Sequence, residues 1–230
     1  MLGLRHLSAG YNGAIVNREV TLDVARGEVL ALIGRNGVGK TTLARAIIGL
    51  QRPMSGSIAF DGADVTRFSA RRRARMGIGY VPQGRGIFPD LSVEENLKMG
   101  LLIGGRSREI EYAFELFPIL KERRRQLGGT LSGGQQQMLS IGRVLVGQPK
   151  LLVLDEPSDG IQPNIVEQIG DLCRRLNTER GLTIVLIEQN LDLIISCAQR
   201  CLLMEKGAVT EELAPADLDD PEVARRALAV

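Results

Sequence analysis

Uninterrupted apolar runs mark the predicted strands of this chain. Three of them, residues 29–33, 151–154 and 183–187, are rich in leucine, isoleucine and valine. Runs of this length and composition are typical of parallel strands that are buried on both faces. Shorter apolar segments predict further strands at residues 2–8, 20–24, 58–60, 78–81 and 201–204.

Helical spacing of apolar residues separates these strands. It predicts helices over residues 41–50, 164–179 and 191–198. Between residues 91 and 148 the spacing is helical throughout, and its apolar positions begin with Val93, Leu97, Leu101 and Leu102. Because no strand pattern interrupts this stretch, we expect a helical lobe at about residues 88–148, inserted between parallel strands.

The alternation of strands and helices predicts a single α/β domain over residues 1–230 with a mostly parallel sheet. Near the end, Pro215 and Pro221 are expected to break up a short acidic tail.

Charge does not favour a nucleic-acid partner. The chain has 29 Lys and Arg against 27 Asp and Glu, a net charge of +2, so no strong overall field is expected. The arginine-rich stretches at residues 71–75 and 123–125 are interpreted as solvated helix faces, since they are short and poor in aromatic residues.

Cysteine usage and hydropathy suggest a reducing compartment and no membrane span. Cys173, Cys197 and Cys201 are odd in number and lack C-x-x-C spacing, so we expect buried thiols. No apolar run approaches 18 residues and no signal-peptide pattern is present. If transport is the function, the pore must therefore be another polypeptide.

The first chemical motif is a glycine-rich segment that fits G-x-x-x-x-G-K-[ST] between a predicted strand and a predicted helix. Its residues are Gly34, Arg35, Asn36, Gly37, Val38, Gly39, Lys40 and Thr41. The glycines let backbone N–H groups turn toward a phosphate. Lys40 supplies a point charge, and the hydroxyl of Thr41 is placed to ligate Mg²⁺.

Two adjacent carboxylates, Asp155 and Glu156, follow the apolar run at residues 151–154. Asp155 can hold Mg²⁺. Glu156 can accept a proton from, or orient, an attacking water, a role worth roughly 10²–10⁴-fold in rate. Solvated acids at a strand end are common by themselves, but the phosphate loop upstream favours the catalytic interpretation.

A third segment begins a predicted helix at residues 135–146. Ser132 is expected to be its N-cap. Gly133 and Gly134 leave the first N–H groups of the helix uncovered, which favours a second anion site. An ordinary capped helix is the competing interpretation.

Together these three segments resemble the ATPase subunit of ABC transporters. The five-residue signature of that family is matched by Leu131, Ser132, Gly133, Gly134 and Gln135. The resemblance covers essentially the whole chain. It implies a phosphate-loop NTPase core with an antiparallel β edge and a helical signature lobe. It also implies ATP and Mg²⁺ as cofactors, with ATP held between the phosphate loop of one subunit and the signature of another.

The resemblance also implies roles for single residues. Gln83 matches the glutamine that touches Mg²⁺ and the attacking water and that senses the membrane partner. Tyr11 lies where the family places an aromatic ring on adenine, although a packed tyrosine stays open as an alternative. Asp159 and Gly160 match the loop that crosses the dimer interface. The implied ATP-binding residues are Tyr11, Gly34, Arg35, Asn36, Gly37, Val38, Gly39, Lys40, Thr41, Thr42 and Gln83.

One position departs from the family pattern. After the strand at residues 183–187 the family carries a histidine that contacts the γ-phosphate, and this chain has Gln189 there. An amide can donate to phosphate but cannot carry a proton. The only histidine, His6, lies outside every motif, so we expect no imidazole-like titration of hydrolysis. A dimer with one competent site is the alternative explanation.

The residues around Gln189 are similar to those of one of two paired ATPases in importers of branched-chain amino acids, urea and short amides. This implies a second ATPase subunit, two integral membrane permease subunits and, indirectly, a solute-binding protein. It also implies a peripheral position on the cytoplasmic face of the inner membrane. Whether the dimer is formed by two identical chains stays open.

Three other functions were considered. ABC-type ATPases of DNA repair carry long coiled coils between phosphate loop and signature, and residues 60–126 have no room for them. Translation-associated ABC proteins hold two tandem copies of the motifs, whereas this sequence has one. A regulatory module that binds ATP without hydrolysis is the third, because Gln189 replaces the histidine.

Overall fold

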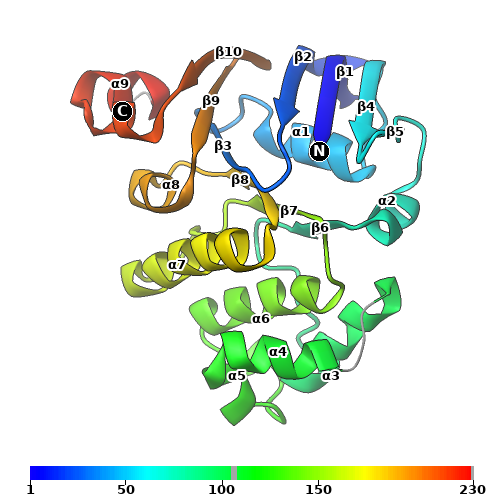
Figure 1. Cartoon of the computed structure of the whole chain (residues 1–230), viewed down its shortest axis with the longest axis vertical. Coiled ribbons are helices and arrows are strands. Elements are labelled where there is room, and N and C mark those ends of the chain that lie inside the picture. Colours follow the sequence, from blue (N-terminus) through cyan, green and yellow to red (C-terminus); the bar gives the residue numbers. More distant parts are fainter. Residues whose placement is uncertain (105–107, 229–230) are drawn as a thin grey trace.

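The computed structural model describes residues 1–104 and 108–228. Two sheets lie toward one end of the molecule and a helical lobe forms the other end (Figure 1). The smaller sheet is antiparallel, in the order β2-β1-β4-β5. Its strands are β1 (Leu2–Tyr11), β2 (Ala14–Val24), β4 (Ser55–Phe60) and β5 (Ala63–Asp64).

The larger sheet has the order β10-β9-β3-β8-β7-β6 and is parallel except for the pairing of β9 with β10. Its strands are β3 (Val29–Ile33), β6 (Ile78–Val81), β7 (Leu151–Asp155), β8 (Thr183–Ile187), β9 (Arg200–Glu205) and β10 (Ala208–Leu213). The predicted fold class, a mostly parallel sheet with an antiparallel β edge and a helical lobe, is confirmed.

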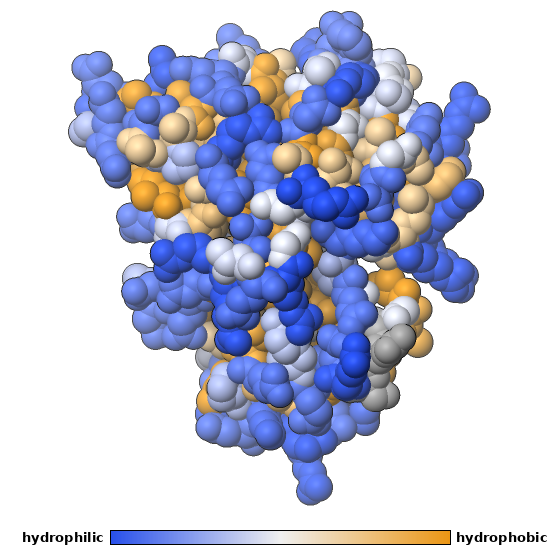
Figure 2. All heavy atoms as spheres, in the orientation of Figure 1, coloured by the Kyte–Doolittle hydropathy of each residue, from blue (hydrophilic) through white to orange (hydrophobic). Residues whose placement is uncertain are grey.

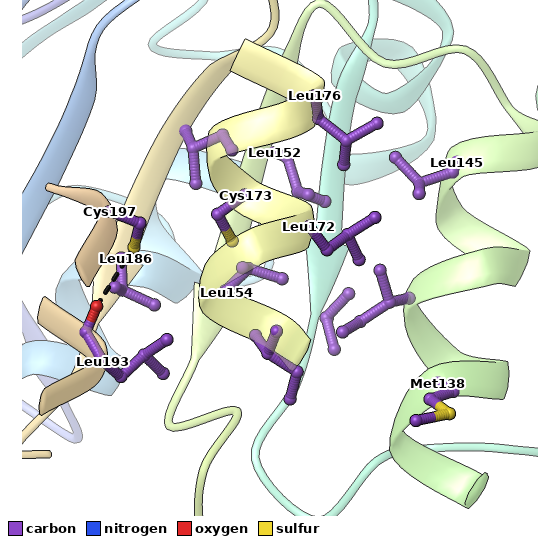
Figure 3. Close-up of a cluster of buried hydrophobic side chains, with 14 of the residues drawn as sticks. Met138, Leu145, Leu152, Leu154, Leu172, Cys173, Leu176, Leu186, Leu193 and Cys197 are labelled. Carbon is purple, nitrogen blue, oxygen red and sulfur yellow. Dashed lines mark hydrogen bonds between the residues drawn. The ribbon is translucent and has the colours of Figure 1, made fainter. Parts of the chain in front are cut away.

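Alternating residues of the central strands supply two separate hydrophobic clusters. In β3, Leu30 and Leu32 pack toward the antiparallel sheet and helix α1 (Lys40–Ile48), whereas Val29, Ala31 and Ile33 pack toward the helices on the other face. Successive side chains of a strand point to opposite faces, so a strand between two layers must be apolar throughout. Figure 3 shows the second cluster, where Leu152 and Leu154 of β7 lie behind Leu172 and Leu176.

Four helices flank the sheets: α1 (Lys40–Ile48), α2 (Ala70–Met76), α7 (Pro163–Arg180) and α8 (Leu191–Cys197). Helix α1 ends two residues earlier than predicted because Gly49 adopts a left-handed φ of 83° and closes the helix. Leu50, the last residue of the predicted helix, lies outside α1 and is 63% exposed.

The helical lobe lies between β6 and β7 in the chain. Its elements are α3 (Val93–Met99), η1 (Gly100–Ile103), α4 (Arg108–Leu116), α5 (Pro118–Glu122), η2 (Gly128–Thr130) and α6 (Gly133–Val146). Leu102 was predicted on an apolar face but is 71% exposed on the 3₁₀ turn η1. Residues 105–107 of the predicted lobe lie outside the described residues.

The predicted acidic tail is wrong. The segment folds as β10, the 3₁₀ helix η3 (Pro215–Asp219) and α9 (Pro221–Leu228). Leu213, Leu218 and Ala227 are buried in the same cluster as the central strands. Both prolines occupy the first turn of a helix, where a missing N–H costs little.

The prediction of a solvated arginine face at residues 71–75 is wrong for Arg73, which is 1% exposed. Its guanidinium donates to the carbonyls of Ala46 and Ile47 at 2.7 Å each, at the C-terminus of α1. It also donates to Thr66 O and Phe68 O. The buried charge is therefore held by carbonyl oxygens and by the negative end of the helix dipole.

The expectation of buried thiols is confirmed, because Cys173, Cys197 and Cys201 are all free and buried. Figure 3 shows the hydrogen bond that the Cys197 thiol donates to the carbonyl oxygen of Leu193. Within residues 1–104 and 108–228, no helix has the length and hydropathy needed to cross a membrane.

Candidate active site

The phosphate loop connects β3 to the N-terminus of α1. Gly34 has a φ of 146°, and a Cβ there would lie 2.3 Å from the carbonyl oxygen of Met204. Gly39 has a φ of 107°, and a Cβ there would lie 2.7 Å from Asn17 Nδ2. Only glycine fits both positions. No side chain caps α1, so its first N–H groups can bind an anion.

Lys40 points back over this loop and is only 4% exposed. Its Nζ donates to Gly34 O at 2.5 Å and to Arg35 O at 3.0 Å. It also lies 3.8 Å from Glu156 Oε1. Burial lowers the pKa of Lys40, and the charge of Glu156 opposes that shift. The ammonium is therefore held in place before any phosphate arrives.

Asp155 ends β7 and has no exposed surface. Its Oδ1 accepts a hydrogen bond from Thr41 Oγ1 at 3.1 Å, and its Oδ2 accepts one from Tyr80 Oη at 2.9 Å. Burial raises the pKa of Asp155, and these two hydrogen bonds oppose the shift. The hydroxyl and carboxylate predicted to hold Mg²⁺ thus lie in direct contact.

Glu156 begins the turn after β7 with a left-handed φ of 48°. Its Oε2 accepts from Gln83 Nε2 at 2.7 Å, and its Oε1 accepts from Gln189 Nε2 at 3.1 Å. Burial raises the pKa of Glu156, while the charge of Lys40 opposes the shift. Two amides from different loops therefore orient this carboxylate.

Gln189 joins the phosphate loop to Glu156. Besides its contact with Glu156, its Nε2 donates to Asn36 Oδ1 at 2.6 Å. The residue that replaces the expected histidine therefore lies between the loop and the candidate base. The two amide protons account for both of these contacts.

Tyr11 lies at the end of β1 and is 39% exposed. Its hydroxyl accepts a hydrogen bond from Arg45 Nη1 at 3.4 Å, on the outer side of α1. Thr42, also predicted to bind nucleotide, is buried in the first turn of that helix. The aromatic ring is thus accessible next to the phosphate loop helix.

The signature residues lie elsewhere. Ser132 is the N-cap of α6, as predicted, and forms a capping box with Gln135. Leu131 is buried beneath them. Ser132, Gly133, Gly134 and Gln135 line a hollow of about 520 Å³ together with Gly160. No residue of the phosphate loop lines it, so this chain does not bring its own signature to its own phosphate loop.

Asp159, on the loop that leads to this hollow, is exposed and accepts from Gln83 Nε2 at 3.3 Å. Gln83 therefore touches both Glu156 and Asp159. The predicted interface loop and the candidate catalytic carboxylate share one amide donor.

The sequence profile of the ABC transporter family matches residues 17–159. The chain belongs to the ABC transporter family. It is 40% identical to the high-affinity branched-chain amino acid transport ATP-binding protein BraG of Pseudomonas aeruginosa over 97% of each chain. It is 34% identical to the probable branched-chain amino acid transport ATP-binding protein LivF of Archaeoglobus fulgidus, over 91% of this chain and 90% of LivF. The methionine import ATP-binding protein MetN of Cupriavidus metallidurans is 36% identical, but only 63% of its length is covered.

Solved ABC structures share the fold. The ADP conformation of MJ1267, an ATP-binding cassette of an ABC transporter, is 26% identical with a TM-score of 0.84, covering 98% of this chain and 97% of that one. The dimeric cassette MJ0796 is 23% identical with a TM-score of 0.85, over 94% of this chain and 99% of MJ0796, which shows the shared fold alone. The family resemblance is thereby confirmed, and with it the prediction that the chain is an ATP-hydrolysing subunit.

Three side chains of this ABC ATPase site were not identified from the sequence. Tyr80 contacts Asp155 because β6 pairs with β7 in parallel. Glu188 is 2% exposed and accepts from the backbone N–H groups of Ser158, Gln189 and Asn190 at 2.8–3.0 Å. It thereby fixes the loops after β7 and β8 to each other. The third residue, Arg85, follows Gln83 closely.

Arg85 ties the segment after Gln83 to the signature helix of the ABC ATPase. Its Nη1 donates to Gln136 Oε1 at 3.0 Å, and its Nη2 donates to Gly160 O at 3.4 Å. Its own carbonyl accepts from the hydroxyl of Ser140 in α6. The sequence signal for Arg85 was its positive charge two residues after Gln83. Its partners could not be inferred, because they lie 51 and 75 residues away in the chain.

Proposed function

We propose that this ABC ATPase drives the uptake of branched-chain amino acids. The support is the length of the match: BraG is covered over 97% of its chain, whereas MetN extends well beyond the matched part. Urea and short amides are the second candidate substrates, because residues 34–40 and 78–89 resemble that branch of importers. The solute itself would contact the permease and the solute-binding protein.

Nucleotide binding in this proposal rests on the phosphate loop. The N–H groups at the start of α1 and the ammonium of Lys40 would hold the phosphates. Tyr11 would stack on the base. The residues that fit Mg²⁺ are Thr41, Asp155 and Gln83, all oxygen donors, and the contact of Thr41 with Asp155 places two of them together. The metal would neutralise charge on the transferred phosphoryl group.

Hydrolysis in this proposal depends on Glu156. The proposal rests on one observation: the Glu156 carboxylate accepts hydrogen bonds from the side-chain amides of Gln83 and Gln189. A carboxylate fixed by amide donors keeps free lone pairs to accept a proton from water. The burial that raises its pKa also brings its basicity closer to neutral pH, where a general base is most effective.

A complete site would need a second ATPase subunit. The signature hollow beside Gly160 is separate from the phosphate loop, so each would meet its counterpart on the partner. The partner's signature would then supply the first N–H groups of its own helix to the γ-phosphate. We infer a heterodimer, in line with the paired ATPases of branched-chain amino acid importers.

The permease would dock in an apolar groove of about 200 Å³ between α2 and α6. Leu50, Ala74, Ile103 and Val144 line it, and Leu50 and Ile103 are exposed. Figure 2 shows apolar surface at this edge of a largely hydrophilic face. Two permease subunits would use such grooves on the two ATPases, and the pair would then lie on the cytoplasmic face of the inner membrane.

The decisive experiment compares the wild-type chain with Glu156→Gln, for hydrolysis within the reconstituted importer and for mass as the isolated chain. We expect hydrolysis to fall by roughly 10²–10⁴-fold, because the base is lost, while ATP binding is retained. Light scattering of the ATP-loaded variant then reports the mass. A persistent monomer is expected for a chain that needs a different partner, and a dimer would mean that it completes both sites by itself.

Glu167→Gln is the matched control, since Glu167 is exposed on α7 and away from the site. It should leave hydrolysis and binding unchanged. Equal hydrolysis by wild type and Glu156→Gln would contradict the proposed chemistry. To test the solute, the importer reconstituted with its permease should show ATP hydrolysis stimulated by leucine-loaded binding protein, and stimulation by urea alone would favour the second candidate.

A further inference from the structure

Tyr80 belongs to two regions of the molecule at once. Its ring lines the apolar groove between α2 and α6. Its hydroxyl donates to Asp155 Oδ2 at 2.9 Å, in the interior of the site. The side chain is half-buried, which fits a ring edge in the groove and a hydroxyl in the core.

The strand register explains this placement. Tyr80 pairs with Val153 of β7, two residues before Asp155 in the neighbouring parallel strand. Phenylalanine at this position would fill the same space in the groove but could not donate a hydrogen bond. The hydroxyl is therefore the part of the side chain that acts on the carboxylate.

Asp155 depends on few partners. Its side chain is fully buried, and its two oxygens accept one hydrogen bond each, from Thr41 and from Tyr80. Thr41 is itself a candidate metal ligand, so its hydroxyl must serve two roles. The Tyr80 bond is then the contact that holds Asp155 independently of the metal and the phosphates.

We propose that Tyr80 is a positioning residue. Its hydroxyl orients the Asp155 carboxylate toward the metal, and its ring couples this orientation to the occupancy of the apolar groove. This rests on the proposed function, which assigns Mg²⁺ to Thr41 and Asp155. A segment seated in the groove contacts the ring of Tyr80, and any displacement of that ring moves the hydroxyl on Asp155. The groove and the metal site are thus joined through one side chain.

The test measures metal affinity directly. Mn²⁺ is titrated into the ATP-loaded full chain, and free Mn²⁺ is followed by electron paramagnetic resonance. Tyr80→Phe should weaken Mn²⁺ binding about tenfold, since a hydrogen bond to a buried carboxylate is lost. ATP binding in EDTA and the melting temperature should stay close to wild type. Tyr112→Phe, in the helical lobe, is the matched control and should behave as wild type.

Asp155→Asn distinguishes a failure of the metal assignment from a failure of the role proposed for Tyr80. If it leaves Mn²⁺ affinity unchanged, the metal assignment of the proposed function is wrong. If it abolishes Mn²⁺ binding while Tyr80→Phe binds Mn²⁺ as wild type does, the proposed function stands and the role of Tyr80 is overturned. A loss of stability in Tyr80→Phe with unchanged Mn²⁺ affinity would likewise show a structural role only.

The coupling to the groove is tested by filling it. Ala74 lines the groove from α2, and Ala74→Trp places an indole there as a substitute for a bound segment. This variant should shift Mn²⁺ affinity when Tyr80 is present and have no effect in the Tyr80→Phe background. Additive effects of the two substitutions would overturn the coupling.

Discussion

Two helix N-termini in this ABC ATPase are candidates for phosphate, and they are built differently. Helix α1 has no side-chain cap, and the charged groups of Lys40, Asp155 and Glu156 lie around its start. Helix α6 is closed by the capping box of Ser132 and Gln135, and no charged residue occurs in its signature. The first end is charged and deep, and the second is neutral and lies beside an open hollow.

The difference indicates that the two helix ends have different roles in nucleotide binding. A deep site with its own cation would bind the nucleotide to its own chain, and a neutral helix end would contact the nucleotide of the partner chain without competing for it. The signature end is also attached through contacts that can rearrange, because Arg85 joins it to the segment after Gln83 by side-chain hydrogen bonds. Three experiments can test this difference between the two helix ends.

Removing the cation of α1 should have the largest effect. Lys40→Met should weaken ATP binding about a hundredfold, because charge-assisted hydrogen bonds to the phosphates are lost. Ser132→Ala should leave the ATP affinity of the isolated chain unchanged, since in the proposed dimer the signature contacts the nucleotide of the partner. Calorimetric titration of both variants checks this, with melting curves to confirm folding. Equal losses of affinity would show that both helix ends bind the same nucleotide within one chain.

The pH dependence of hydrolysis should come from Glu156, which lies beside the start of α1. Burial raises the pKa of Glu156, so the fold favours its protonated form. The rate requires the carboxylate and should therefore fall as the pH drops through a value above that of an ordinary glutamate. Gln189→His should add a second inflection at a pH of about 6.5. A wild-type profile that already contains this inflection would contradict the assignment of Gln189.

The smallest effect is expected from the cap of α6. Ser132→Ala should lower the free energy of unfolding by about 1 kcal/mol, as for other N-caps. Ser92→Ala is the matched control, because Ser92 and Glu95 form the same capping box on α3. Urea unfolding should show similar losses for both, whereas hydrolysis by the assembled importer should fall only for Ser132→Ala. A fall in hydrolysis for both variants would mean that lobe stability, rather than the signature, limits the rate.

Sequence patterns predicted the parts of the fold that are buried on both faces. The strands at residues 78–81 and 183–187 begin and end where the apolar runs do. The edge strand β10 was missed because three of its six residues are polar, so the segment has no continuous apolar run. Leu213 is the one buried residue of this strand, and a single buried position gives no alternating pattern.

For the site, residues within motifs could be predicted and their neighbours could not. Tyr80 and Arg85 act through contacts that depend on the order of strands and the placement of α6, which the sequence does not state. Arg73 was missed for another reason. Arginine is usually exposed, and only the structure shows the ring of carbonyls that holds it at the end of α1.

The backbone at Glu156 imposes a cost on the catalytic residue itself. Its φ of 48° lies in the left-handed region, where a residue other than glycine typically costs roughly 1–3 kcal/mol. Glycine would relieve this strain but would remove the carboxylate that accepts hydrogen bonds from Gln83 and Gln189. Selection of this chain for thermal stability alone would therefore tend to discard Glu156, and only selection for turnover retains it.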